Sequence, residues 1–91
     1  MATKFDIAEY LDSDEMIKTY LDTVLEEGNS NDIITALGHV AKAVGMSKIA
    51  EDTGLSRTSL YKALSEGARP QFETILKVLR AVGGRLNLNA T

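Results

Sequence analysis

The 91-residue sequence predicts an all-α fold, a bundle of five or six short helices in a single domain over residues 1–91. Apolar residues recur at intervals of three and four along most of the chain, which is the spacing of one face of an α-helix. Aromatic residues are few: two phenylalanines, three tyrosines and no tryptophan. Aliphatic-rich chains of this size build helix bundles more often than β-sandwiches. The length allows one hydrophobic core but is too short for two independent ones.

Two helices are expected in the acidic segment 6–28. The first is a short helical piece from Asp6 to Leu11. Asp12, with Glu15 three residues later, matches a capping box and should begin the second helix. The apolar stripe of this second helix consists of Ile17, Tyr20, Leu21, Val24 and Leu25. Gly28 should end it as a C-terminal cap.

A helix-turn-helix core is expected over residues 29–83, and its leading helix follows Asn29, a residue type that caps helix N-termini well. The apolar stripe of this helix consists of Ile33, Leu37, Val40, Ala41 and Val44. Gly45 stops the pattern. Glycines therefore delimit the helices of the first half of the chain.

Residues 47–64 predict the helix-turn-helix itself, two short helical patterns joined by a turn at Gly54. Gly54 can adopt the left-handed conformation that ends one helix, and the Ser56 hydroxyl can accept a backbone N–H from the first turn of the next. The apolar faces that can pack together are Ile49, Ala50 and Thr53 before the turn, and Leu60, Ala63 and Leu64 after it. The free face of the second helix carries hydroxyls and positive charge: Arg57, Thr58, Ser59, Tyr61, Lys62 and Ser65. A short helix with such a face is suited to the major groove of DNA.

A last helix and a short C-terminal β-strand are expected after residue 66. Pro70 has the fixed φ that suits a helix start. The apolar stripe that follows is Phe72, Ile75, Leu76, Leu79 and Val82, and Gly83 and Gly84 should break the helix. Residues 85–89 alternate between apolar and polar side chains, which is typical of a strand. The segment 84–91 is then either a strand that pairs with its copy in a homodimer or a tail whose two leucines pack on the core.

The two halves of the chain carry opposite charge. Residues 1–45 contain three lysines and nine acidic residues, a net charge of −6, whereas residues 46–91 contain seven basic and four acidic residues, a net charge of +3. This asymmetry predicts an anionic partner for the second half and a cationic partner for the first. A solvated helix surface that keeps the protein in solution is the simpler interpretation of the acidic residues.

Catalytic and metal-binding chemistry has little support in the sequence. The chain has no cysteine and a single histidine, His39, which is expected to be an exposed polar residue. Neither a Cys/His pair nor a histidine-rich metal site can then form within one chain, and no GxGxxG motif or P-loop is present. We therefore expect no enzymatic activity, no metal and no cofactor. No apolar run approaches the ~20 residues that span a bilayer, and the N-terminus does not resemble a signal peptide, so a cytoplasmic protein is expected.

Two family resemblances follow from these segments. The leading helix from Ile33, the turn IAEDTGLS, the helix LYKAL and the closing helix PQFETILKVLRAVG resemble the Cro and phage-repressor class of helix-turn-helix proteins, which implies a lambda-repressor-like fold. The segment FDIAEYL, the block from LGHV to RAVG and the leucine-alternating end extend a narrower resemblance over nearly the whole chain, to the addiction-module antidote proteins known as HigA-type antitoxins. This second resemblance implies a prokaryotic antitoxin that represses its own operon by binding double-stranded operator DNA and that silences a small basic toxin, a RelE-like ribonuclease.

The resemblance also assigns roles to individual residues. Base edges are read by Arg57, Thr58 and Lys62, flanked by Ser59 and Tyr61, and DNA phosphates are contacted by Met46, Ser47, Lys48, Ser56 and Arg69. Two departures from the phage-repressor pattern bear on these roles. Met46 replaces the usual amide side chain and leaves only a backbone N–H for phosphate, and the segment between Leu60 and Gly67 is one residue longer.

The candidate toxin-binding residues are chosen by the sign of their charge alone. They are Asp6, Glu9, Asp12, Asp14, Glu15, Asp22, Glu26 and Glu27. Carboxylates in these positions can oppose a cationic RNA-binding surface and mask it. Two other functions stay open: a stand-alone or prophage transcriptional regulator without a toxin partner, and an interaction protein whose helix-turn-helix no longer contacts DNA.

Overall fold

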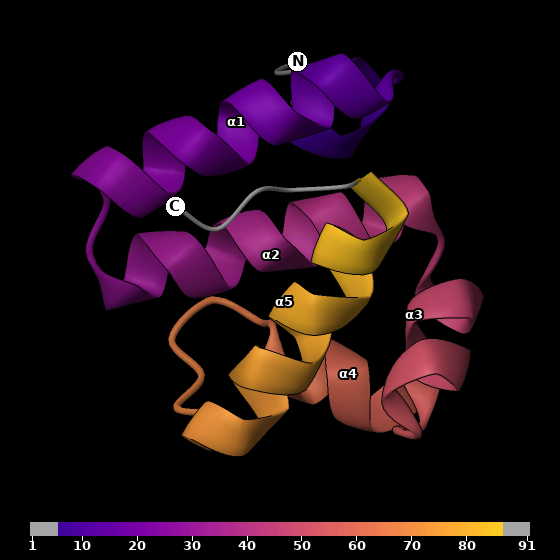
Figure 1. Ribbon diagram of the computed structural model, residues 1–91. Coiled ribbons are helices and arrows are strands. Elements are labelled where there is room, and N and C mark those ends of the chain that lie inside the picture. Colours follow the sequence, from indigo (N-terminus) through magenta and orange to yellow (C-terminus); the bar gives the residue numbers. More distant parts are fainter. Residues whose placement is uncertain (1–5, 87–91) are drawn as a thin grey trace, which may run out of the picture.

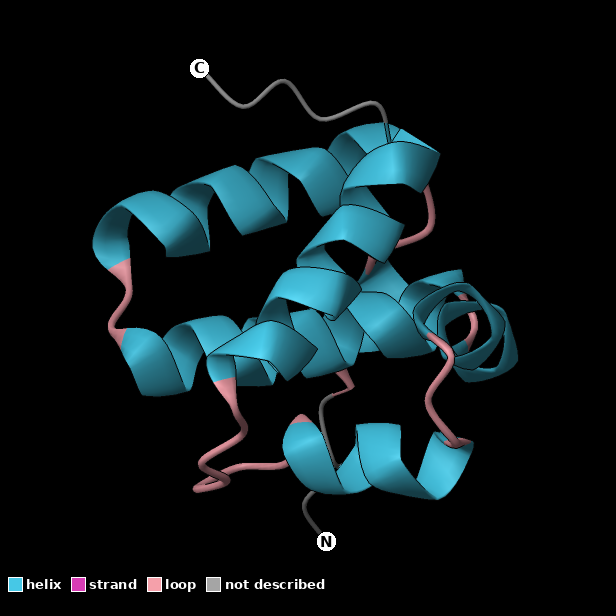
Figure 2. Cartoon of the chain, turned by 60° about the horizontal axis from the view of Figure 1, so that its bottom comes forward, coloured by secondary structure: helices cyan, strands magenta, loops and turns pink. Residues whose placement is uncertain are grey.

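The computed structural model describes the backbone of residues 6–86 and the side chains of residues 6–83. Its elements are a 3₁₀-helix η1 (Ile7–Tyr10) and five α-helices: α1 (Asp14–Glu27), α2 (Ser30–Val44), α3 (Met46–Thr53), α4 (Arg57–Ala63) and α5 (Phe72–Leu86). No β-strand occurs within residues 6–86 (Figure 2). The predicted all-α helical bundle is confirmed.

Helix α2 lies at the centre of the arrangement. It contacts η1 and α1 on one side and α3 and α5 on the other (Figure 1). Because only Gly28 and Asn29 separate α1 from α2, the two helices run antiparallel and form one layer of the bundle. Helices α3, α4 and α5 form the other layer, where α3 contacts both α4 and α5.

The core is aliphatic and draws on every α-helix. The largest fully buried side chains are Leu21, Leu37, Val40, Ile49, Leu60, Val78 and Val82. All of them except Val78 lie on the predicted apolar stripes. Two predicted core residues are exposed instead, since Leu25 retains 45% and Phe72 77% of its accessible surface. The buried face of α5 is therefore rotated from the predicted one, and Val78 occupies the place that the sequence pattern gave to Leu76 and Phe72.

Side-chain caps fix where the first helices begin. Asn29 and Asp32 form the capping box of α2: the Asn29 side chain accepts the N–H of Asp32 at 2.9 Å, and the Asp32 carboxylate accepts the N–H of Asn29 at 3.1 Å. For α1 the predicted capping box of Asp12 and Glu15 is wrong by one residue. The hydroxyl of Ser13 caps this helix and accepts the N–H of Met16 at 3.2 Å. An aspartate and a serine cap equally well, so local sequence alone did not decide between adjacent residues.

The end of α5 differs from the prediction. The helix starts at Phe72, two residues after Pro70, and continues through Gly83 and Gly84 to Leu86. A glycine inside a helix costs about 1 kcal/mol relative to alanine, and the burial of Val78 and Val82 against the core offsets that cost. Arg85 and Leu86 are therefore helical, and the strand expected over 85–89 is wrong for these two residues. The rest of that segment, with the homodimer pairing predicted from it, lies outside the described residues.

An ion pair joins η1 to the C-terminal part of α2. The Lys42 ammonium donates to an Asp6 carboxylate oxygen at 2.7 Å, and the other Asp6 oxygen accepts the N–H of Ala8 as the cap of η1. The hydrogen bond from Lys42 lowers the pKa of Asp6 below its ordinary value of 3.8, and the same bond raises the pKa of Lys42 above 10.5. Both groups are partly exposed, so the pair acts at the surface and is weakened by salt.

Gly38 marks the closest approach between α2 and the residue that ends α4. A Cβ at this position would lie 2.8 Å from the backbone carbonyl oxygen of Leu64. Real Cβ atoms do not approach that closely, and a backbone atom cannot rotate away as a side chain can. The glycine therefore allows the end of α4, at Leu64, to lie directly against α2.

We predict that Gly38→Ala destabilises the protein by about 1–3 kcal/mol, the range for overpacking, although alanine is the better helix former. Urea unfolding followed by circular dichroism measures the change. Asn31→Ala, at an exposed position of the same helix, serves as the control and should change the free energy of unfolding by less than about 0.5 kcal/mol. An unchanged or higher stability of Gly38→Ala would show that α4 does not rest on this contact.

We also predict that the Asp6–Lys42 pair contributes to stability at neutral pH and that its contribution disappears in acid. Because folding lowers the pKa of Asp6, the contribution is fully present above pH 3.8, the ordinary value, and is lost as the pH falls through the lower folded-state pKa. Asp6→Asn retains a cap for η1 but removes the charge. Urea unfolding of this variant should differ from wild type at pH 7 and coincide with it at pH 2, with Asp22→Asn as an exposed control. A difference that persists at pH 2 would assign the effect to the cap and contradict the ion pair.

Candidate nucleic-acid interface

The turn between α3 and α4 has the geometry that its sequence predicts. Gly54 adopts a left-handed conformation with φ of 76°, and its N–H donates to the carbonyl of Ala50 at 2.9 Å. The Thr53 hydroxyl donates to the carbonyl of Ile49 at 2.8 Å and accepts the N–H of Leu55 at 3.3 Å. These bonds occupy the backbone groups on both sides of Gly54. The angle between α3 and α4 is therefore set by local hydrogen bonds as well as by the core.

Ser56 begins α4 as its N-cap. Its hydroxyl oxygen accepts the N–H of Ser59 at 3.0 Å and donates to the hydroxyl oxygen of Ser59 at 2.9 Å. The predicted cap is confirmed. The second bond has a further consequence, because one lone pair of the Ser59 hydroxyl is already used inside the turn. Of the residues predicted to read bases, Ser59 is the one with the fewest hydrogen-bonding groups left for a ligand.

The exposed face of α4 carries the predicted base-reading residues. Within Arg57–Ala63 only Leu60 is buried, and it packs into the core with Leu64. Thr58 and Lys62 lie on the side of the helix opposite Leu60, as the helical repeat requires. All five predicted residues are exposed: Arg57, Thr58, Ser59, Tyr61 and Lys62. The structure thus places them together on one short helix.

Tyr61 differs from the other four because it leans toward α2. Half of its surface is buried, and it lines a hollow of about 350 Å³ together with residues of α2 that include Gly38 and Lys42, with Met46 of α3, and with the residues that follow α4. Its proximity to Lys42 contributes to the raised pKa of that lysine. The side chain of Tyr61 therefore belongs partly to the packing between α2 and α4, with its remaining surface exposed beside Lys42. Sequence reasoning did not connect Lys42 with this region, because the two residues are far apart in the chain.

The predicted phosphate-contacting residues separate into two kinds. Four of them are exposed around the helix-turn-helix: Ser47, Lys48, Ser56 and Arg69. The side chain of Met46 is buried in the core with 7% of its surface accessible, so only its backbone can meet a ligand. Gly45, which precedes α3 with φ of 125°, has no side chain to cap this helix. The N-terminus of α3 therefore presents the Ser47 hydroxyl and the Lys48 ammonium group to solvent, and Gly45 provides no side chain to cap its first turn.

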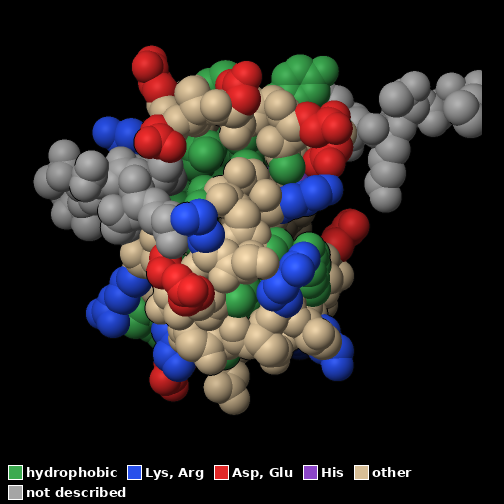
Figure 3. Space-filling view, turned by 90° about the vertical axis from the view of Figure 1, so that its right-hand side faces the viewer, with side chains coloured by type: hydrophobic (Ala, Val, Ile, Leu, Met, Phe, Trp, Pro, Cys, Tyr) green, Lys and Arg blue, Asp and Glu red, His purple; other side chains and the backbone are tan. Residues whose placement is uncertain are grey.

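Charge is unevenly distributed over the surface. Figure 3 views the molecule from the side of α3 and shows most acidic side chains on the upper part of this face, around η1 and α1. Most lysine and arginine side chains lie below them, over the second layer of helices. On this face, the charge asymmetry of the sequence is thus retained as a mainly acidic upper part and a lower part where most of the basic side chains lie.

The predicted toxin-binding acids lie on η1, α1 and the residues between them. All are exposed except Asp6, which is partly buried and paired with Lys42. Glu15, Asp22 and Glu26 are spaced by seven and four residues along α1 and share its outward face. Among the side chains that the structure describes, Asp6 is the one member of the set with a cationic partner.

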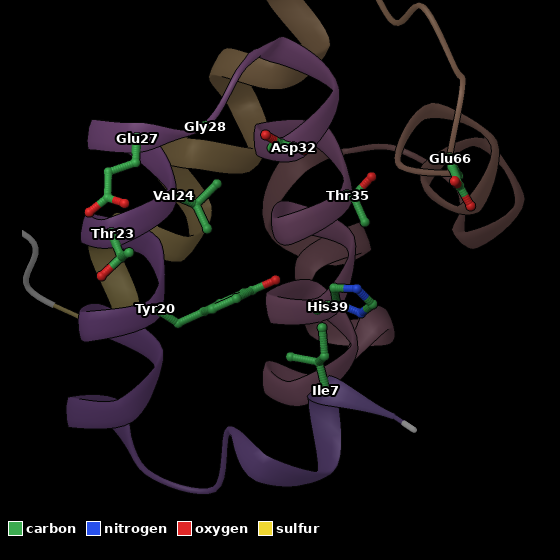
Figure 4. Close-up of a pocket in the computed structure, with 10 residues that line it drawn as sticks. All are labelled: Ile7, Tyr20, Thr23, Val24, Glu27, Gly28, Asp32, Thr35, His39 and Glu66. Carbon is green, nitrogen blue, oxygen red and sulfur yellow. The ribbon is translucent and has the colours of Figure 1, made fainter. Parts of the chain in front are cut away.

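A second hollow of about 500 Å³ lies between α1 and α2 (Figure 4). The Tyr20 ring projects from α1 toward α2, near His39, and burial raises the pKa of its hydroxyl. His39 is half-buried in this hollow, so the expectation that it is simply exposed is wrong. Within the part of the chain that the structure describes, no group of His, Cys, Asp and Glu side chains is arranged to hold a metal ion. None of the helices in that part is long and apolar enough to cross a membrane.

Comparisons with known proteins give one family and one relative. A family model described as "Probable addiction module antidote protein" matches residues 1–90. The chain is also similar to an uncharacterized protein of Haemophilus influenzae, with 50% identity over 78 residues that cover 86% of this chain and 80% of that protein. No solved structure gives a significant match.

Proposed function

We propose that this chain, which belongs to the family of probable addiction module antidote proteins, is a DNA-binding antitoxin that represses its own operon. In this proposal the core is a lambda-repressor-like helix-turn-helix, with α4 as the recognition helix. The acidic segment of η1 and α1 binds and neutralises a small basic toxin of the RelE-like ribonuclease type. The observation that carries the proposal is the exposed polar and cationic face of α4, held on a rigid turn, on a body whose other end is acidic.

The geometry of α4 supports DNA binding. A helix of seven residues with one buried side chain presents the rest of its surface to a groove. Arg57, in the first turn, can donate two parallel hydrogen bonds to the O6 and N7 of a guanine, and Thr58 and Lys62 point outward from the opposite side to Leu60. Helix-turn-helix proteins contact the DNA backbone from the segments that adjoin the recognition helix. Here those segments carry Ser47 and Lys48 on α3 and Arg69 in the loop before α5.

Charge supports the second role. Residues 6–28 contain eight carboxylates and a single lysine, Lys18. A partner with a cationic RNA-binding surface is attracted to this segment, and the same segment repels DNA from this end of the molecule. The two ligands can therefore bind at different places on one chain.

We predict that Arg57→Ala weakens operator binding by about 1–3 kcal/mol, the range for one bidentate base contact. The measurement is a fluorescence anisotropy titration of a labelled duplex taken from the DNA immediately upstream of the operon. Lys18→Ala, an exposed cation of α1, is the control and should leave the affinity nearly unchanged. Wild-type affinity should also fall as salt rises, because phosphate contacts release counterions. Unchanged affinity and unchanged sequence selectivity of Arg57→Ala would show that Arg57 does not read a base.

We predict that the purified product of the adjacent gene, a small basic protein, binds this chain and loses its ribonuclease activity in the complex. Isothermal titration calorimetry at 50 and 300 mM salt should show weaker binding at the higher concentration, since opposite charges attract across the interface. A neighbouring gene product that fails to bind at either salt concentration would contradict the antitoxin role. Operator binding would then favour a stand-alone regulator.

A further inference from the structure

An apolar groove lies between η1 and α1 in the acidic part of the described chain. Its volume is about 610 Å³, and its walls include Ile7 and Tyr10 of η1 and Met16 and Tyr20 of α1. Leu11, which connects the two elements, is buried beneath it. Tyr10 and Met16 are two of the five large apolar side chains that stay exposed in the described residues, with 59% and 46% of their surfaces accessible.

The surroundings of this groove are anionic. Glu15 lines it directly, and none of the described residues that line it is a lysine or an arginine. Glu9, Asp12 and Asp14 are exposed on the same two elements and the connection between them. An apolar centre with a charged rim is the usual composition of a protein–protein interface.

The charge also decides between possible occupants. A second copy of this chain would bring the same carboxylates face to face, which is destabilising. Nucleic acid is repelled for the same reason. A protein surface that presents an apolar side chain between lysines or arginines complements this site. The apolar side chain fills the groove, and the cations pair with the carboxylates around it.

We propose that this η1–α1 groove receives an apolar side chain of the toxin, flanked by basic residues that pair with Glu15 and its neighbours. The inference rests on the proposed antitoxin function and adds the place where the toxin docks. Met16 then contributes to the apolar contact, because it is exposed in the free protein and would be covered in the complex.

The test compares two variants of α1, Met16→Ser and Leu25→Ser. Met16 lines the groove, whereas Leu25 lies elsewhere on α1 with almost the same exposure, 45% against 46%. The full-length chain is titrated with the purified product of the adjacent gene by calorimetry. Met16→Ser should reduce the affinity about tenfold or more, as expected for a central interface residue, and Leu25→Ser should change it by less than about twofold. Thermal unfolding of both variants checks that each is folded.

A charge-reversal pair provides a second readout. Glu15→Lys at the groove should weaken binding more than Glu26→Lys at the far end of α1, although both variants change the net charge equally. Equal losses of toxin affinity for Met16→Ser and Leu25→Ser, or for the two charge reversals, would overturn the proposal that the toxin docks in this groove. The antitoxin role would stay intact. A change in oligomeric state of Met16→Ser with unchanged toxin affinity would assign the groove to a second copy and also overturn the inference. Failure of the wild-type chain to bind would instead remove the proposed function on which the inference rests.

Discussion

The contact on which the rest of the structure depends is the one between Gly38 of α2 and the backbone of Leu64. Because no side chain separates them, the end of α4 lies directly on the central helix. The burial of Leu60 fixes which side of α4 faces the core and leaves Thr58 and Lys62 facing outward, whereas the Gly38 contact sets how close the end of α4 lies to α2. This close approach also brings Tyr61 next to Lys42. A glycine in the middle of a helix is a signal for such packing, because the helix is weakened by it unless something else requires it.

Features that depend on a few adjacent residues were predictable from the sequence. The Asn29 cap of α2, the left-handed turn at Gly54 and the Ser56 cap are of this kind. The buried face of α5 was not predictable, because Val78 and Phe72 are both apolar and only the position of α3 and α2 decides which of them is buried. The continuation of α5 through two glycines likewise depends on tertiary packing, which overrides local propensity.

The same distinction applies to the candidate sites. The exposed residues of α4 follow from its helical repeat once Leu60 is taken as buried, so Arg57 and Lys62 could be placed from sequence. The burial of Met46 could not be predicted in this way, because a methionine at a helix N-terminus is as compatible with the surface as with the core. The Asp6–Lys42 pair joins residues 36 positions apart and has no local signal. The groove between η1 and α1 has no local signal either, because it is formed by residues of two elements packed around the buried Leu11.

The single buried residue of α4 has a consequence for how this chain can diverge. Substitutions on the exposed face of a helix typically change stability by less than about 0.5 kcal/mol, because they disturb no packed contact. Leu60, the cap at Ser56 and the partly packed Tyr61 carry the structural requirements of α4, and the exposed positions Arg57, Thr58 and Lys62 are nearly free of them. After a gene duplication, the exposed face of α4 can therefore change while the fold is conserved. Under the proposed function, two descendants can then come to prefer different DNA sequences without either of them passing through an unstable intermediate.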